Sequence, residues 1–311
     1  MNRAFIFPGQ GSQAVGMGKD FFDTEPVAKD VFNQVNEFLG YKLTDIIFYD
    51  KNNELSITNY TQPAIMATSA AILATLLNKT GKKINELCDI VAGHSLGEYS
   101  ALYAAECMNL EQVSKLLQIR SGAMHKASLN SQSAMAACMG VDPIDLQNMI
   151  DSHVKNGVCQ IANDNTDGQV VISGHTSNID MIIAELKLEK RRAIKLNVSA
   201  AFHSKLMNDA ETEMNEALSK EKFNVPQVPV ICNVNASLET NKSSIRENLV
   251  RQICSSVRWR ETMDQFAKRG ITELVEIGPG KVLSNLAKKS KHEFIIHNIA
   301  TIEDMYNFIE K

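Results

Sequence analysis

The stretch Gly93-His94-Ser95-Leu96-Gly97 follows the apolar run 90–92 and precedes a helical pattern over 96–105. It matches the G-x-S-x-G nucleophile elbow, in which a serine occupies a strained turn between a strand and a helix. Glycine on both sides permits the turn, because a residue without Cβ tolerates crowding and positive φ. The stretch therefore predicts a hydrolase-like α/β core in which Ser95 is a nucleophile.

On both sides of this turn in the sequence, short apolar strands alternate with helical patterns, which is typical of an α/β protein with a mainly parallel sheet. A helix is predicted to begin near Pro63, because proline suits the first turn of a helix. The strands expected in the sheet are 3–7, 89–94, 228–234, 273–277 and 294–298, and further helices are expected at 110–127 and 281–289.

The pattern changes between 133 and 198, where the predicted order of elements is β-α-β-β-α-β, as in a ferredoxin-like unit. These elements are expected at 134–141, 143–153, 158–163, 169–173, 177–189 and 193–198, with a hairpin turn over 163–168. We therefore predict a large catalytic subdomain from 1–130 and 199–311 and a small ferredoxin-like subdomain at 131–198. A ligand is expected to bind between the two.

Composition narrows the function classes. The 311 residues carry a formal net charge of -4, which argues against nucleic acid as the main partner because phosphate binding requires a basic face. No apolar run approaches the roughly 18 residues of a membrane span, and no signal peptide is evident. The six cysteines include no C-x-x-C pair and lie mostly in apolar segments, which indicates reduced thiols and a cytoplasmic protein. We expect no membrane partner.

A serine needs a neighbouring base, and seven histidines are available. His94 is a poor choice, because adjacent residues of a strand point to opposite faces. His203 lies in a loop of small residues where the chain re-enters the large subdomain, so it is either the base or a plain polar loop residue. His292 and His297 are the main alternatives, whereas His153 and His175 are expected at the surface.

Arg120 interrupts the apolar stripe of the helix predicted at 110–127. A buried arginine requires an anionic partner, because burying it unpaired is costly. An internal salt bridge or a side chain that reaches the surface would explain it. The alternative is a bidentate clamp on a carboxylate of the substrate.

Five blocks of this chain resemble the malonyl-CoA:acyl carrier protein transacylases, and the resemblance covers nearly the whole sequence. They are Phe7-Pro8-Gly9-Gln10-Gly11-Ser12-Gln13, Thr61-Gln62-Pro63-Ala64, Gly93-His94-Ser95-Leu96-Gly97-Glu98, Ala201-Phe202-His203-Ser204 and Ile277-Gly278-Pro279-Gly280. The resemblance implies transfer of a malonyl group from coenzyme A to the phosphopantetheine thiol of an acyl carrier protein, for fatty acid synthesis, through a malonyl-serine ester. Coenzyme A and phosphopantetheine would be parts of the substrates, with no resident cofactor and no metal.

The same resemblance implies a role for each matching residue. Ser95 looks like the nucleophile, His203 the base and Arg120 the clamp on the malonyl carboxylate, while a main-chain carbonyl at Gln252 orients the histidine. The backbone N–H groups of Leu96 and Gln10 resemble the oxyanion hole. Phe202 resembles the pattern for malonyl over methylmalonyl selection, and Ala201 departs from the proline or glycine of some relatives.

Other functions are weaker on this sequence. An esterase or thioesterase would need the order serine, acid, histidine, for example Asp209 or Asp264 followed by His292 or His297. A patatin-like lipase would need Asp167-Gly168, which falls in the predicted hairpin turn. An acyltransferase of a polyketide pathway would share the chemistry of the main hypothesis, and a binding module would leave the elbow without a purpose.

The acyl carrier protein is acidic, so its docking requires a local basic patch on this slightly acidic chain. Two candidates are Lys190-Arg191-Arg192 and the group of Lys288, Lys289 and Lys291. Each alone is better explained as a solvated helix end, where cations suit the helix dipole. Together they predict a docking surface that includes Arg192, Lys288 and Lys289.

Overall fold

The computed structural model describes residues 2–196, 198 and 200–310, and it contains two sheets. The first has the strand order β11-β10-β1-β2-β7-β8, and all its neighbours are parallel except β7 and β8. The predicted strand at 228–234 is shortened to two residues. The strands are β1 (Arg3–Phe7), β2 (Ile90–Gly93), β7 (Val230–Ile231), β8 (Leu238–Glu239), β10 (Glu273–Ile277) and β11 (Ile295–Ile299).

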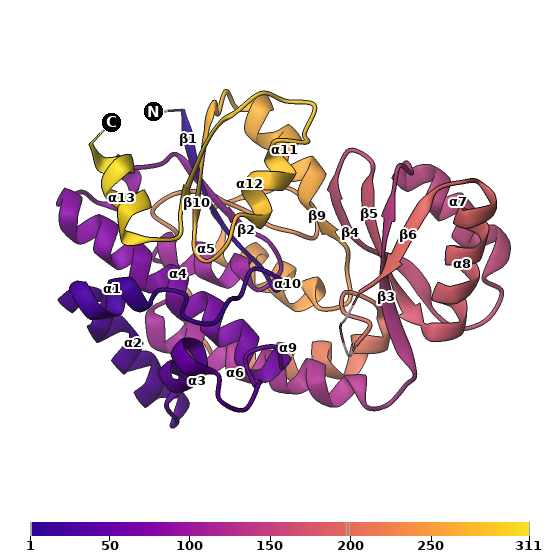
Figure 1. The fold of residues 1–311 in the computed structure, drawn as a ribbon, viewed down its shortest axis with the longest axis horizontal. Coiled ribbons are helices and arrows are strands. Elements are labelled where there is room, and N and C mark those ends of the chain that lie inside the picture. Colours follow the sequence, from indigo (N-terminus) through magenta and orange to yellow (C-terminus); the bar gives the residue numbers. More distant parts are fainter. Residues whose placement is uncertain (1, 197, 199, 311) are drawn as a thin grey trace.

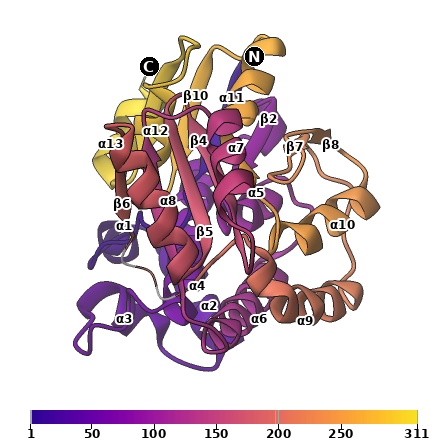
Figure 2. The same cartoon turned by 90° about the vertical axis from the view of Figure 1, so that its right-hand side faces the viewer.

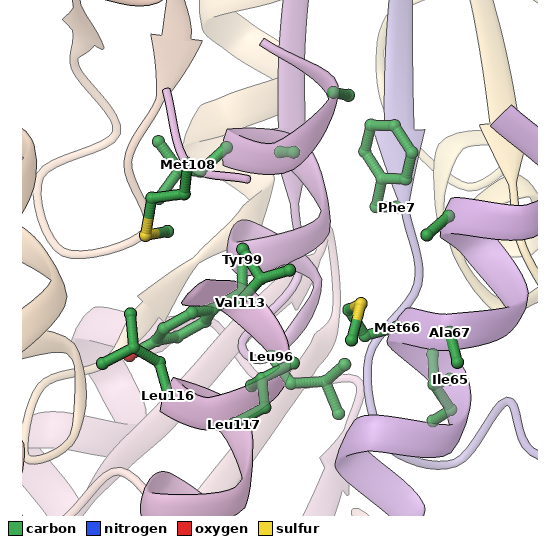
Figure 3. Packing of buried hydrophobic residues seen from close by; sticks show 14 of the residues in the cluster. Phe7, Ile65, Met66, Ala67, Leu96, Tyr99, Met108, Val113, Leu116 and Leu117 are labelled. Atoms are coloured by element: carbon green, nitrogen blue, oxygen red, sulfur yellow. The ribbon is translucent and has the colours of Figure 1, made fainter. Parts of the chain in front are cut away.

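Helices cover this sheet because its strands are apolar on both faces. Along β1, Phe5 and Phe7 belong to one apolar cluster and Ala4 and Ile6 to another, as the two-residue period of a strand requires. Figure 3 shows part of the first cluster, where Phe7 and side chains from α4, α5 and α6 lie close together. The helices are α1 (Lys19–Thr24), α2 (Pro26–Leu39), α3 (Leu43–Tyr49), α4 (Thr58–Thr80), α5 (Gly97–Ala104), α6 (Leu110–Ser128), α9 (Asn208–Ser219), α10 (Lys242–Gln252), α11 (Trp259–Lys268), α12 (Val282–Ala287) and α13 (Ile302–Ile309), with short 3₁₀ turns at Ile84–Glu86 and Lys205–Met207.

Helix α4 corrects one prediction, since it begins at Thr58 and Pro63 lies inside it. Proline removes one backbone donor from a helix. The hydroxyl of Ser121 on α6 donates instead to the carbonyl of Asn59, at 3.3 Å. Among the described helices, α4 is long and apolar enough to cross a membrane, but 83% of its most apolar window is buried in the protein, as expected of a core helix.

The second sheet has the order β6-β3-β5-β4-β9, and its elements follow the predicted β-α-β-β-α-β order. The predicted turn at 163–168 is too long, because β4 continues to Thr166 and only Asp167 and Gly168 make the turn. Strand β9 joins this sheet from outside the 131–198 range, in parallel with β4. The elements are β3 (Ser133–Met139), α7 (Pro143–His153), β4 (Cys159–Thr166), β5 (Gln169–His175), α8 (Thr176–Leu188), β6 (Arg192–Lys195) and β9 (Val257–Arg258).

The two sheets lie side by side, with β3–β6, α7 and α8 at the right of Figure 1 and in front in Figure 2. A bidentate ion pair between Asp164 on β4 and Arg260 on α11 joins the two parts, with its shortest contact at 2.8 Å. The domain limits at 130/131 and 198/199 stay predictions. Asn197 and Ser199, at the end of the predicted strand 193–198 and at the second limit, lie outside the described residues.

Candidate active site

The elbow depends on two glycines that leave no room for a side chain. A Cβ on Gly93 would lie 1.8 Å from the Gly97 carbonyl oxygen, and a Cβ on Gly97 would lie 2.2 Å from the carbonyl oxygen of Phe7. Ser95, between them, has φ of 55°. A non-glycine residue in this conformation is strained, and such strain is concentrated at functional sites. The turn leaves the Ser95 side chain partly exposed at the end of β2.

His203 contacts the hydroxyl of this serine. Its Nε2 lies 2.8 Å from Ser95 Oγ, and its Nδ1 lies 2.9 Å from the main-chain oxygen of Gln252 at the end of α10. A carbonyl oxygen can only accept, so Nδ1 must carry the proton and donate it there. The lone pair of Nε2 therefore faces the serine hydroxyl, which is the arrangement of a general base.

Burial sets the charge of this imidazole. The side chain of His203 is 3% exposed, and this burial, together with the nearby positive charge of Arg120, lowers the pKa of His203 to about 3. His203 is thus neutral near pH 7, as proton acceptance requires. No carboxylate oxygen among the described residues accepts a hydrogen bond from its ring.

The other histidines have other partners. His94 Nε2 contacts Asn165 at 2.9 Å, which agrees with the prediction that it points away from Ser95. His292 pairs with Asp264 at 2.7 Å, and His297 with Glu273 at 3.0 Å. An acid–histidine pair of the hydrolase kind therefore exists in Asp264–His292, but among the described residues the histidine that contacts Ser95 Oγ is His203. His175 is half-buried rather than at the surface, and its Nδ1 accepts from a backbone N–H.

Arg120 on α6 is 1% exposed and points at the nucleophile. Its two terminal nitrogens donate to Gln62 Oε1 at 2.5 Å, Gln252 Oε1 at 2.9 Å and Ser95 Oγ at 3.1 Å, and burial lowers its pKa. Within the described chain no carboxylate makes a salt bridge with it, so the internal ion pair considered above is absent. A buried guanidinium held by neutral amides keeps its charge available for an anionic ligand.

Two backbone donors lie at the same turn. Leu96, directly after Ser95, is the cap of α5, and Gln10 lies in the loop after β1. In the described part of the chain neither backbone N–H donates a hydrogen bond to protein, although the Gln10 side chain donates to Thr58. Free N–H groups beside a nucleophile suit an oxyanion.

Sequence reasoning assigned no role to Asn233, Glu98 or the side chain of Gln62. Asn233 contacts the backbone on both sides of the elbow, and Glu98 Oε2 accepts from the Asn233 N–H at 3.0 Å and from Gln252 Nε2 at 2.7 Å. Burial raises the pKa of Glu98 to about 7. Gln62 and Glu98 belong to the quoted motifs, but only the fold shows what they contact.

The remaining predicted residues lie as follows. Phe202, next to His203 in the chain, is buried and belongs to the first apolar cluster. Arg192 on β6 and Lys288 and Lys289 after α12 are exposed. Backbone contacts join the segments that carry these three residues. Arg192 is the strand partner of Met139, the N–H of Gly140 donates to the oxygen of Gly168, and the N–H of Lys291 donates to Asp167.

In the described residues no group of three or more His, Cys, Asp or Glu side chains is arranged to hold a metal ion.

Comparison with known proteins agrees with this geometry. The model of the acyl transferase domain family matches residues 4–305. A malonyl CoA-acyl carrier protein transacylase of Bacillus subtilis is 41% identical over 92% of this chain and 89% of its own. An acyl-carrier-protein-S-malonyltransferase of Bartonella henselae has a TM-score of 0.96 at 39% identity, over 100% of this chain and 99% of its own. A malonyl-transacylase solved with a type II polyketide acyl-carrier protein has a TM-score of 0.95 at 33% identity, over 100% and 99% of the two chains.

Proposed function

This chain belongs to the acyl transferase family, and we propose that it transfers a malonyl group from malonyl-CoA to the phosphopantetheine thiol of an acyl carrier protein through an ester on Ser95. Its relatives of similar length are malonyl-CoA:acyl carrier protein transacylases, so it is an acyltransferase that supplies fatty acid synthesis. The contacts around Ser95 support the role that we propose for each residue.

In the first half-reaction, Ser95 Oγ attacks the thioester carbonyl of malonyl-CoA as His203 Nε2 takes its proton. The carbonyl oxygen becomes an oxyanion within reach of the Leu96 and Gln10 N–H groups. Collapse of this intermediate breaks the C–S bond, and His203 returns the proton to the departing sulfur. Coenzyme A leaves, and the malonyl group remains as an ester on Ser95.

The second half-reaction repeats these steps with a different thiol. The phosphopantetheine thiol gives its proton to His203 and attacks the ester carbonyl, the C–O bond to Ser95 breaks, and the proton returns to Oγ. Coenzyme A and phosphopantetheine thus enter as substrates, without a resident cofactor. Two steps at one serine predict ping-pong kinetics.

One observation carries this proposal: both His203 and Arg120 contact the single atom Ser95 Oγ, at 2.8 and 3.1 Å. A hydrolase needs only the base. A buried cation beside the nucleophile that makes no salt bridge with a carboxylate among the described residues suits an acyl group that ends in a carboxylate, as malonyl does. The bulk of Phe202, next to the base, supports exclusion of an α-methyl group.

We further propose that the carrier docks on the side where Arg192, Lys288 and Lys289 are exposed. The contacts through Gly140, Gly168 and Asp167 support a common surface, because the β4–β5 turn lies between the two basic groups. The free state of all six cysteines supports a cytoplasmic enzyme.

Intact mass after mixing with malonyl-CoA tests the proposal. A malonyl adduct on the Ser95 peptide is expected in the wild type and not in Ser95→Ala. Ser100→Ala is the matched control and should keep the adduct, because Ser100 lies on α5 after the elbow and its hydroxyl makes no hydrogen bond to the described residues. An adduct that survives Ser95→Ala contradicts the proposal, and release of free malonate without a thiol acceptor would point to a thioesterase.

A second candidate function differs from this one only in the carrier, which would belong to polyketide synthesis instead of fatty acid synthesis. A structural relative acts with a type II polyketide acyl-carrier protein, and the chemistry is the same. Comparing transfer rates to carriers of fatty acid and polyketide synthesis separates the two.

A further inference from the structure

Gln160 on β4 connects two loops that meet at the active site. Its Nε2 donates to the main-chain oxygen of His203 at 3.2 Å and to that of Cys254 at 3.1 Å. Its Oε1 accepts from the backbone N–H of Lys205 at 3.1 Å. Both amide hydrogens and the amide oxygen are therefore used, and all three partners are backbone groups outside the sheet to which Gln160 belongs.

These backbone groups lie next to the reacting atoms. His203, whose φ is 56°, has the left-handed conformation that non-glycine residues rarely adopt. Cys254 lies two residues after Gln252, whose carbonyl oxygen holds the His203 ring. The side chain of Gln160 thus holds both the loop that contains His203 and the segment after Gln252, whose carbonyl orients the His203 ring.

We propose that Gln160 is a positioning residue: by clamping the carbonyls of His203 and Cys254 it holds Nε2 of the base against Ser95 Oγ. Through it the small subdomain takes part in catalysis without touching substrate. This inference rests on the proposed function, because it assumes that His203 activates Ser95. A displacement of about 1 Å in a reacting group can cost on the order of a hundredfold in rate.

The test compares Gln160→Met, which keeps the length of the side chain but cannot form the three hydrogen bonds, with Gln160→Ala. The matched control is Gln147→Met on α7, a half-buried residue whose amide donates to Asp151 of the same helix. Each protein is mixed with malonyl-CoA at a series of concentrations, and the rate constant, the KM and the amplitude of Ser95 acylation are measured in single turnovers. His203→Ala is measured in parallel.

We expect both Gln160 variants to lower the acylation rate constant roughly tenfold to a hundredfold, with full amplitude and an unchanged KM for malonyl-CoA. Gln147→Met should match the wild type. A lower amplitude at an unchanged rate constant would show lost folding rather than lost positioning, and it would overturn the proposal, as would wild-type kinetics in Gln160→Met. If Ser95 of His203→Ala is acylated at the wild-type rate, His203 is not the base. That result contradicts the proposed function itself, independently of the results for the Gln160 variants.

Discussion

Asn233 Oδ1 accepts a hydrogen bond of 2.7 Å from the backbone N–H of Ser95, which lies 138 residues earlier in the chain. The amide nitrogen of the same side chain donates to the Gly93 carbonyl, also at 2.7 Å. One buried amide therefore spans the strained turn from both sides. Because it occupies the Ser95 N–H, the next N–H, that of Leu96, is the one left free for an oxyanion.

Asn233→Ala should weaken both the turn and the fold. It leaves two backbone groups of the elbow unpaired, and each buried group left in this way costs about 1–3 kcal/mol in the free energy of unfolding. Acylation of Ser95 should also slow, because the turn is no longer held. Urea unfolding and single-turnover acylation measure the two effects. Asn235→Ala, two residues along in a partly exposed turn, is the control and should change neither much. Wild-type stability in Asn233→Ala would mean that the glycines alone hold the elbow.

Arg120→Ala should cost malonyl transfer on the order of 2–5 kcal/mol, since two charge-assisted hydrogen bonds to the malonyl carboxylate are lost. The kcat/KM for acetyl transfer should fall far less or even rise, because acetyl-CoA has no such carboxylate. Arg120→Lys should rescue only in part, since an ammonium lacks the planar fork that contacts Gln62 and Gln252. The measurement is kcat/KM of the wild type and of each Arg120 variant, for malonyl-CoA and for acetyl-CoA. Equal losses for both would make Arg120 a structural residue.

The acylation rate should stay nearly constant from about pH 8 down to about pH 5, because a base must be neutral to accept a proton. The pKa of His203 is lowered from 6.5 to about 3 by burial, so the fraction of neutral base does not fall until the solution is far more acidic. The same shift makes the fold less stable as the pH falls below about 6.5, since the unfolded chain then takes up a proton that the folded His203 does not. Stopped-flow acylation across this range is the measurement. An acid limb centred near pH 6.5 would show that the base is hydrated in the working enzyme.

Charge reversal at Arg192, Lys288 and Lys289 should raise the KM for the acyl carrier protein and flatten its salt dependence, because steering of an acidic partner is lost. Loading from malonyl-CoA should change much less. Reversal of Lys51, Lys82 and Lys220, three exposed lysines outside the proposed docking surface, is the control of equal charge. Carrier transfer that is equal in the two triple variants would place the docking surface elsewhere.

The sequence alone determined the parts of this protein whose causes are local. The turn at Ser95 requires glycine at 93 and 97 because the backbone itself comes within 2.2 Å of where a Cβ would lie, and this need is visible in five residues. Period-two and helical patterns predicted a mainly parallel sheet and the β-α-β-β-α-β order of the second sheet, as the structure has them. Some predicted lengths are wrong, since α4 begins at Thr58 rather than near Pro63 and β4 continues to Thr166, where it pairs with β5. The helices α1–α3, α9–α11 and α13 and the strands β8 and β9 had no prediction.

Only the tertiary structure decided which groups meet at Ser95. Residue patterns left His203 as an open choice and Arg120 as a possible salt bridge, because a single pattern does not reveal contacts between residues far apart in the chain. Their roles at Ser95 came from the sequence only through the resemblance to the transacylases. The fold brings Arg120 to the Gln252 side chain, 132 residues away, and places the Gln252 carbonyl on the His203 ring. Asn233 and Gln160 carry no signal in their own segments, since an isolated amide looks like any polar residue until burial gives each of its hydrogen bonds a partner. The nucleophile is therefore a property of the local sequence, and its activation is a property of long-range packing.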